Sequence, residues 1–167
     1  MTEAAPTSPA RPSAEREPTA ARQGDAVVGE LATFLGYALR RAQLAVFEDF
    51  RRSVGMLGMR PAQFSVLVTI DASPGLKQTE VAAALGIQRA NFVAMVNELE
   101  RRGWIERRPL DRRSLALHLT EAGAAKLAEG LEAQRAMEAR YERILGPGGR
   151  QTLLDLLGAI QRAPGDA

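Results

Sequence analysis

Apolar residues recur at helical spacing between residues 27 and 53, on more than one side of the predicted helix. One set, spaced by three or four residues, comprises Val28, Leu31, Leu35, Ala38, Ala42 and Val46. A second set lies on other faces and comprises Phe34, Tyr37, Leu44 and Phe47. A helix that is apolar on several sides needs several partner surfaces, and in so small a domain the simplest extra surface is a second copy of the chain.

Three shorter helices are predicted next. The first begins at Pro61, whose fixed φ suits the first helical position, and the second ends at Gly86. In the third, which Gly103 terminates, one face is formed by Phe92, Met95, Val96 and Leu99. The second and third helices, joined by a tight glycine turn, have the sequence form of a helix-turn-helix.

After Gly103 the apolar period changes from 3.6 to 2, which predicts a β-hairpin. Its two strands are WIERR and SLALHL around the loop PLDRR, with Leu115, Leu117 and Leu119 on one side and Ala116 and His118 on the other. Thr120 is the expected N-cap of a long helix, and a short leucine-rich helix follows the turn GPGG. The fold class is therefore mainly α with one small hairpin.

Composition predicts one folded domain, residues 27–167, behind a disordered tail. Residues 1–26 contain four prolines and no Leu, Ile, Val or aromatic residue, so they lack the apolar surface that offsets chain entropy. The absence of cysteine and the single histidine, His118, leave almost nothing for a zinc site, a thiol nucleophile or a Ser-His-Asp triad. We expect a soluble, cytoplasmic protein with no metal, no cofactor, no membrane span and no enzymatic activity.

Positive charge is concentrated in one segment. Residues 86–113 contain seven arginines against four carboxylates, a net charge of +3, whereas the formal charge of the whole chain is +2. A basic segment on a nearly neutral body is typical of a polyanion binder. A solvated arginine-rich face is the simpler alternative.

The order of elements and five short motifs resemble the MarR family of bacterial transcription regulators. The motifs are Asp111-x-Arg113-x-x-x-Leu117-x-Leu119-Thr120, Pro61-x-Gln63-Phe64, Gln78-Thr79-Glu80, Leu85-Gly86-Ile87 and Leu99-Glu100-x-x-Gly103. The resemblance implies a winged helix-turn-helix: a DNA-binding lobe at about residues 61–120 and dimerisation helices at about 27–53 and 120–163. It also implies a homodimer that binds double-stranded DNA.

The expected DNA contacts lie on the third of the shorter helices and on the hairpin. Arg89 and Asn91 are candidates for base contacts, because Arg pairs with guanine and Asn with adenine. Alternatively, Asn91 only caps the helix and Arg89 only meets phosphate. The wider set of expected DNA contacts comprises Lys77, Gln88, Ala90, Ala94, Arg107, Arg108, Arg112 and Arg113.

Within the hairpin, each basic residue has an expected role. Arg112 at the tip suits a narrow minor groove, and Asp111 is expected to support the wing by holding Arg113. Arg107 and Arg108 are expected on phosphates, with a solvated strand edge as the alternative. Lys77 stands where a Ser or Thr helix cap is usual in the family, which leaves its ammonium for a phosphate.

The resemblance also implies a pocket for a small aromatic or phenolic effector, a carboxylate or a CoA thioester among them. Its expected lining is Tyr37, Arg40, Arg41, Leu44, Met56, Met59 and Gln63. Dimer core and solvated arginines are the alternative for these residues. We therefore expect a ligand-responsive homodimeric repressor, with a winged-helix module that docks an acidic protein partner as the rival hypothesis.

Overall fold

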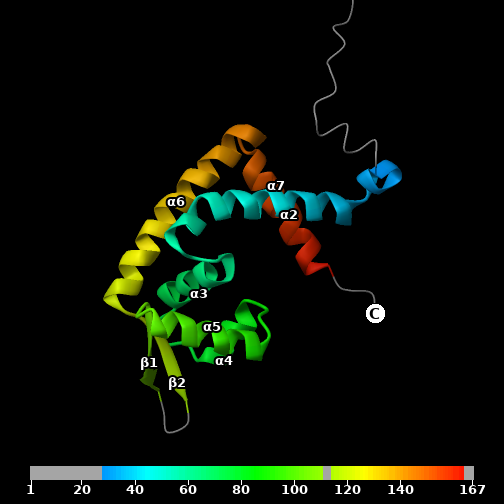
Figure 1. Ribbon diagram of the computed structural model, residues 1–167. Helices are drawn as coiled ribbons and strands as arrows, with labels where there is room; N and C mark the ends of the chain where they lie inside the picture. The colour runs from blue at the N-terminus through cyan, green and yellow to red at the C-terminus, as the bar shows by residue number, and fades with distance from the viewer. Residues whose placement is uncertain (1–27, 111–113, 164–167) are drawn as a thin grey trace, which may run out of the picture. The chain divides into compact units, whose positions relative to one another are not determined.

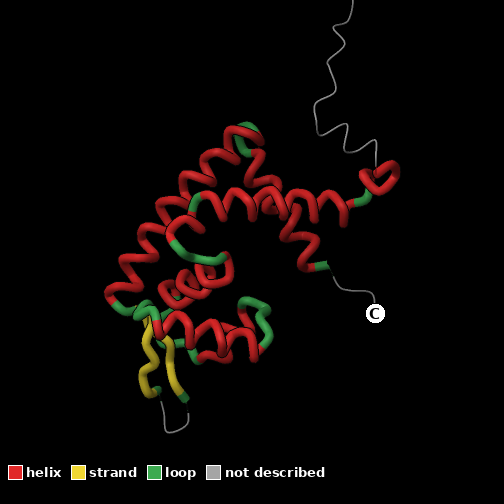
Figure 2. Tube along the Cα trace, viewed as in Figure 1, coloured by secondary structure: helices red, strands yellow, loops and turns green. Residues whose placement is uncertain are grey.

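The computed structural model describes residues 28–110 and 114–163. The elements are η1 (Gly29–Thr33), α2 (Leu35–Arg52), η2 (Val54–Leu57), α3 (Pro61–Ala72), α4 (Gln78–Ala84), α5 (Arg89–Arg101), β1 (Ile105–Pro109), β2 (Leu115–Leu119), α6 (Glu121–Leu145) and α7 (Gly149–Arg162). The structure has the predicted class, helices with a two-stranded hairpin, as Figures 1 and 2 show. The described residues divide into two compact units, one that ends at Gln43 and one that begins at Leu44.

The prediction of one continuous helix over residues 27–53 is wrong, because the segment forms two helices, η1 and α2. The short 3-10 helix η1 ends at Thr33, the backbone of Phe34 is extended with ψ 131°, and α2 begins at Leu35. The Thr33 hydroxyl donates to the Glu30 carbonyl at 2.7 Å and closes this turn locally. Periodicity missed the break because the apolar spacing continues through it.

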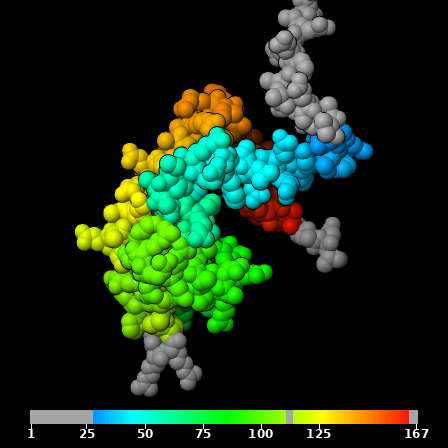
Figure 3. Space-filling view, viewed as in Figure 1, coloured from blue at the N-terminus to red at the C-terminus, as the bar shows by residue number. Residues whose placement is uncertain are grey.

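In the second unit, the core lies where α3, α4, α5, α6 and the hairpin meet. The residues of α3 that are buried here are Gln63, Val66, Leu67 and Ile70. Apolar side chains from the other elements complete the core: Val81, Phe92, Val96, Leu99, Ile105, Leu117 and Leu127. In the space-filling view, the residues coloured green, from α4 to β1, make one continuous mass (Figure 3).

The hairpin is antiparallel, with Ile105 opposite Leu119 and Pro109 opposite Leu115. Its burial differs from the predicted alternation, because Leu115 is 48% exposed whereas Ala116 is buried. Lys77 forms an isolated antiparallel bridge with Ala116 and so lies beside β2. This backbone pairing covers Ala116, and Leu115 lies at the end of the strand next to the loop.

The long helix α6 starts against the base of the hairpin. Thr120 is its N-cap, as predicted, and accepts a hydrogen bond from the Gly123 N–H at 2.9 Å. The Thr120 hydroxyl also donates to the Gly103 carbonyl at 2.5 Å, and its N–H donates to the Trp104 carbonyl at 3.1 Å. The first turn of α6 is thereby fixed to the chain that leads into β1.

No helix among residues 28–110 and 114–163 is long and apolar enough to cross a membrane. In the same described residues, no three His, Cys, Asp or Glu side chains gather in a way that could hold a metal ion.

Candidate nucleic-acid interface

The helix pair α4 and α5 is joined by a turn centred on Gly86. Gly86 has φ 61°, in the left-handed region, and the Ile87 N–H donates to the Ala82 carbonyl at 3.0 Å. Because this turn is tight, α5 leaves α4 at once and packs against it (Figure 1). The predicted helix-turn-helix is thus present.

The two faces of α5 separate as predicted. Phe92, Val96 and Leu99 are buried in the core. The opposite face is exposed and consists of Arg89, Ala90, Asn91, Val93, Ala94 and Asn97. This is the arrangement of a helix that is held by one face and offers the other to a partner.

Arg89 and Asn91 are exposed side chains at the start of α5. Within the described residues, neither has a side-chain hydrogen bond or an ion pair. Gln88 precedes them as the N-cap residue, and its side chain makes no capping bond. The structure therefore does not support the alternative in which Asn91 caps the helix, and both side chains remain available to an external group.

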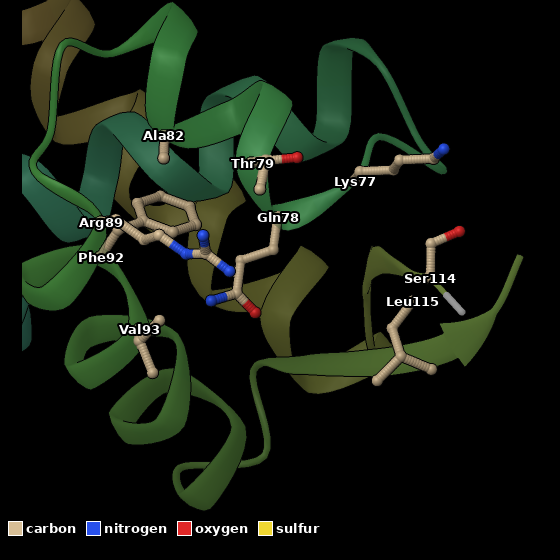
Figure 4. A pocket seen from close by; sticks show the side chains of 9 residues that line it. All are labelled: Lys77, Gln78, Thr79, Ala82, Arg89, Phe92, Val93, Ser114 and Leu115. Carbon is tan, nitrogen blue, oxygen red and sulfur yellow. The ribbon is translucent and has the colours of Figure 1, made fainter.

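A concave surface lies between α4, the start of α5 and β2, with a volume of about 280 Å³. It is lined by Lys77, Gln78, Thr79, Ala82, Arg89, Phe92, Val93, Ser114 and Leu115. Figure 4 shows the Arg89 and Gln78 side chains extending into this space opposite the strand that carries Leu115. The concave surface thus brings hydrogen-bond donors of α4 and α5, Gln78 and Arg89, close to the edge of the hairpin at Leu115.

Lys77 directly precedes α4, where the sequence lacks a hydroxyl cap. Its backbone N–H instead donates to the Glu80 carboxylate at 2.7 Å, which supplies half of a capping box. The helix is thereby capped from inside its first turn.

The two arginines of β1 have different surroundings. Arg108 is 57% exposed, and its guanidinium pairs with the neighbouring Glu106 carboxylate at 2.5 Å. The Arg107 side chain is only 18% exposed, pairs with Glu100 and donates to the Asn97 Oδ1 at 2.6 Å. The solvated-edge alternative therefore does not describe Arg107. The predicted contacts Arg112 and Arg113, and their expected support Asp111, lie outside the described residues.

Glu98 links the start of α3 to the end of α5. It pairs with Arg60 at 3.1 Å and with Arg102 at 2.7 Å. Burial alone would raise the pKa of the Glu98 carboxyl, but Arg60, the Gln63 side chain and Arg102 together outweigh it and lower that pKa below its usual value. Arg102 also donates to the Gly58 carbonyl at 2.8 Å and lies 5.0 Å from the centre of the Trp104 ring.

A second hollow region lies around the start of α3. One pocket of about 490 Å³ is lined by Phe47, Phe50, Arg51, Gly55, Gly58, Met59, Arg60 and Pro61. An adjoining pocket of about 550 Å³ shares three of these residues and is lined by Phe47, Arg60, Pro61, Ala62, Ser65, Leu85 and Ile87. The lining is mainly apolar, with two guanidinium groups.

Only part of the predicted effector set lines this region. Met59 does, whereas Met56 is 80% exposed and Leu44 is 55% exposed. Gln63 is buried in α3 and accepts a hydrogen bond from the Arg60 N–H at 3.0 Å. It contributes to a different hollow, one that faces α5. Met56 lies on the short helix η2 and does not line this pocket region, so its predicted effector role stays a prediction.

The remaining three predicted effector residues, Tyr37, Arg40 and Arg41, belong to the first unit. There, Arg41 donates to the Tyr37 hydroxyl at 3.2 Å, and its guanidinium lies 5.9 Å from the ring centre. Sequence reasoning missed Phe47, Phe50, Arg51 and Arg60. The three residues of α2 could have been found from helical spacing, because positions 47, 50 and 51 fall on one face of a helix.

Fold and interface together define a winged helix-turn-helix protein of the DNA-binding class. The sequence model of the MarR family matches residues 57–114. A curated relative, the putative transcriptional regulatory protein for the hcr operon of Thauera aromatica, is 36% identical over 139 residues, 81% of this chain and 84% of the relative. The chain belongs to the MarR family of transcription regulators.

Two solved structures of the transcriptional repressor CouR are similar to this chain. One, bound to a 23-mer DNA duplex, is 50% identical, with 81% of this chain and 97% of that chain covered and a TM-score of 0.78. The other, bound to p-coumaroyl-CoA, is 47% identical, with 81% and 96% covered and a TM-score of 0.75.

Proposed function

We propose that this protein is a ligand-responsive transcriptional repressor that acts as a homodimer on a nearly palindromic DNA site. The observation that carries the proposal is the exposed face of α5. The opposite face of this helix is buried in the core, while the Arg89 and Asn91 side chains have no hydrogen-bond or ion-pair partner among the described residues. Likeness to a repressor solved with a DNA duplex supports the same function.

The contacts divide into base reading and backbone binding. Arg89 presents a fork of donors that matches guanine O6 and N7, and Asn91 matches adenine N6 and N7. Ala90 and Ala94 leave room for thymine methyl groups, while Lys77, Gln88 and Arg108 meet the backbone. In a two-fold dimer the recognition helices lie about 34 Å apart, so half-site centres are about 10 base pairs apart.

The pocket region around Phe47, Met59 and Pro61 is the proposed effector site. Its aromatic and apolar lining suits a flat aromatic group, and the guanidiniums of Arg51 and Arg60 suit the phosphates of a CoA carrier. The CouR complex with p-coumaroyl-CoA supports an aromatic acyl thioester as the ligand class. Arg60 also pairs with Glu98 of α5, which connects this region to the recognition helix.

The test is fluorescence anisotropy of the purified protein with duplex DNA from immediately upstream of its own gene, beside a scrambled duplex. If the dimer neutralises about 8 phosphates, log K falls with log salt at a slope of about −7. Asn91→Ala is expected to weaken the upstream duplex by about 1–3 kcal/mol and the scrambled duplex far less. Arg135→Ala, which removes an exposed charge from α6, is the control. Weak salt dependence without preference for either duplex would instead favour docking of an acidic protein.

The effector arm adds p-coumaroyl-CoA to the preformed DNA complex, with CoA and p-coumarate tested separately. We expect the thioester to release DNA at lower concentration than either part. Arg51→Ala is expected to raise the concentration needed, whereas Arg52→Ala is its matched control, because Arg52 also pairs with Glu48 but does not line the pocket. Release by CoA alone at the same concentration would contradict the aromatic part of the proposal.

A further inference from the structure

Arg107 lies in the middle of β1 on the side that faces the protein. Side chains alternate along a strand, so Arg107 shares a face with Ile105, which is 1% exposed, and lies opposite the buried Leu117. The Arg107 side chain is 18% exposed, against 57% for its neighbour Arg108. Arg107 is thus turned inward and Arg108 outward.

Both terminal nitrogens of Arg107 are engaged by the recognition helix. Nη1 pairs with the Glu100 carboxylate, and Nη2 donates to the Asn97 Oδ1 at 2.6 Å. Asn97 and Glu100 are three positions apart in α5 and are therefore neighbours on one face. Because a guanidinium is a flat, rigid fork, two such contacts fix both the distance and the angle between β1 and α5.

This arrangement leaves Arg107 little charge for DNA. Glu100 neutralises the guanidinium, and a phosphate would have to displace that carboxylate to bind there. On the exposed side of the same strand, Arg108 also pairs with a carboxylate, Glu106, but both partners of that pair are exposed, at 57% and 44%, so a phosphate can reach the guanidinium from solvent. The strand therefore separates a contact inside the protein from a charge available outside it.

We propose that Arg107 is a positioning residue that sets the wing relative to the recognition helix and thereby controls DNA specificity, without itself contacting phosphate. The inference rests on the proposed function. Specific binding requires α5 in the major groove and the wing at the adjacent backbone at the same time, whereas non-specific binding requires only charge near phosphates. Loss of the Arg107 contacts therefore weakens specific binding selectively.

The experiment uses the full chain and two probes: a duplex that the wild-type protein selects from a randomised pool, and its scrambled version. Arg107→Ala is expected to weaken the selected duplex about ten-fold. Binding of the scrambled duplex and the salt slope are expected to stay unchanged. Arg107→Lys keeps the charge but loses the fork, so it is expected to behave like Arg107→Ala. Arg108→Ala removes a charge of the same sign from the exposed side; because Arg108 is a proposed backbone contact, this variant is expected to weaken both duplexes alike and to leave the ratio of their affinities unchanged.

A double-mutant cycle with Glu100→Gln tests the pairing itself. The affinity for the selected duplex divided by that for the scrambled duplex is expected to fall in Glu100→Gln as it does in Arg107→Ala. In the double variant this ratio is expected to be no lower than in either single variant. Asn97→Ala, which removes one acceptor, is expected to give a smaller fall. Trp104 is the only tryptophan, so its fluorescence during urea unfolding shows whether each variant is folded. If Arg107→Ala does not fold, Arg107→Lys and Asn97→Ala carry the test.

Two results overturn the inference. Equal weakening on both duplexes, with the salt slope smaller in magnitude by about 1, identifies Arg107 as a phosphate contact. An unchanged affinity ratio in folded Arg107 variants shows that the contacts do not set specificity. A wild-type protein that selects no duplex overturns the proposed function and this inference together, whereas a selective wild type with unaffected variants overturns the inference alone.

Discussion

At the residue scale, Asp49 joins α2 to a distant part of the chain. It accepts hydrogen bonds from Arg140 at 2.6 Å and from the Tyr141 hydroxyl at 2.7 Å, although these residues lie 91 and 92 positions further along. The same hydrogen bonds, first from Tyr141 and then from Arg140, lower the pKa of the Asp49 carboxyl. Burial and the bond to Asp49 raise the pKa of Tyr141 to about 12.

This shift makes stability depend on alkaline pH. The tyrosine of an unfolded chain loses its proton at about pH 10, whereas folded Tyr141 keeps it to about pH 12. Between these values the unfolded state binds fewer protons, so the contribution of Tyr141 is complete below pH 10 and is lost as pH rises toward 12. Urea unfolding at pH 9, 10 and 11 is expected to show this loss in the wild type and not in Tyr141→Phe.

Tyr37→Phe is the control, because it leaves the Tyr141–Asp49 pair intact and with it the Tyr141 part of the pH dependence. The same dependence in Tyr141→Phe and the wild type would refute the assignment.

Residue roles were predictable where they depend on local rules. Thr120 was identified from the cap pattern, and the exposed positions of Arg89 and Asn91 from helical spacing alone. For Arg107, the expected phosphate contact is untested, but the side chain is held by two residues of another element. A charged residue at an inward position of a strand was the available signal, yet its partners depend on how α5 and β1 pack.

At the element scale, the junction between the wing and α6 depends on a glycine. A Cβ built at Gly123 would lie 1.8 Å from the Trp104 carbonyl oxygen, a backbone atom with no side-chain freedom. Further along α6, a Cβ at Gly130 would meet the flexible Met59 at 2.6 Å and the Phe64 ring at 3.0 Å. The two glycines let α6 approach the wing base and α3 closely.

Gly123→Ala is therefore expected to destabilise the fold by about 1–3 kcal/mol, because the first turn of α6 must move away from Trp104. Helix propensity alone would predict a gain of about 1 kcal/mol for the same change. The measurement is urea unfolding, with Ala125→Gly as the control. Ala125 is exposed in the same turn, so its substitution is expected to destabilise by about 1 kcal/mol through propensity only. A more stable Gly123→Ala variant would contradict the described junction.

Elements with a strong periodic pattern were predicted well, and their interruptions were not. The helix-turn-helix and the hairpin are confirmed because their period and their glycines lie in the local sequence. The break at Phe34 and the burial of Ala116 were missed, since a local hydroxyl bond decides the first and pairing with Lys77 decides the second.

At the scale of the whole molecule, α7 has no buried residue in the described chain. Its exposed large apolar side chains are Leu153, Leu154, Leu156 and Ile160. An apolar set of this kind, repeated at helical spacing, is typical of a surface that a partner covers. The second copy expected from the sequence would supply such a cover, and the proposed dimer uses it.

Light scattering during size-exclusion chromatography is expected to give a dimer for the wild type and a monomer for the double variant Leu156→Glu and Ile160→Glu. Burying two carboxylates in an apolar contact is strongly unfavourable, which is the reason for the expected dissociation. Gln161→Glu adds a charge at an exposed polar position of the same helix and is the control. A wild-type monomer, or a dimer that survives the double substitution, would contradict the use of α7 in self-association.

The fixed start of α6 also has a mechanical consequence. Helix α6 has 25 residues and is therefore about 37 Å long. Thr120 anchors one end to the base of the wing, and α7 contacts the same helix elsewhere. A tilt of about 5° in a rod of this length displaces one end relative to the other by about 3 Å, roughly the length of a hydrogen bond. If α6 moves as a rigid rod, a small tilt imposed at its C-terminal end would therefore displace the base of the wing by about 3 Å, enough to break a hydrogen bond there.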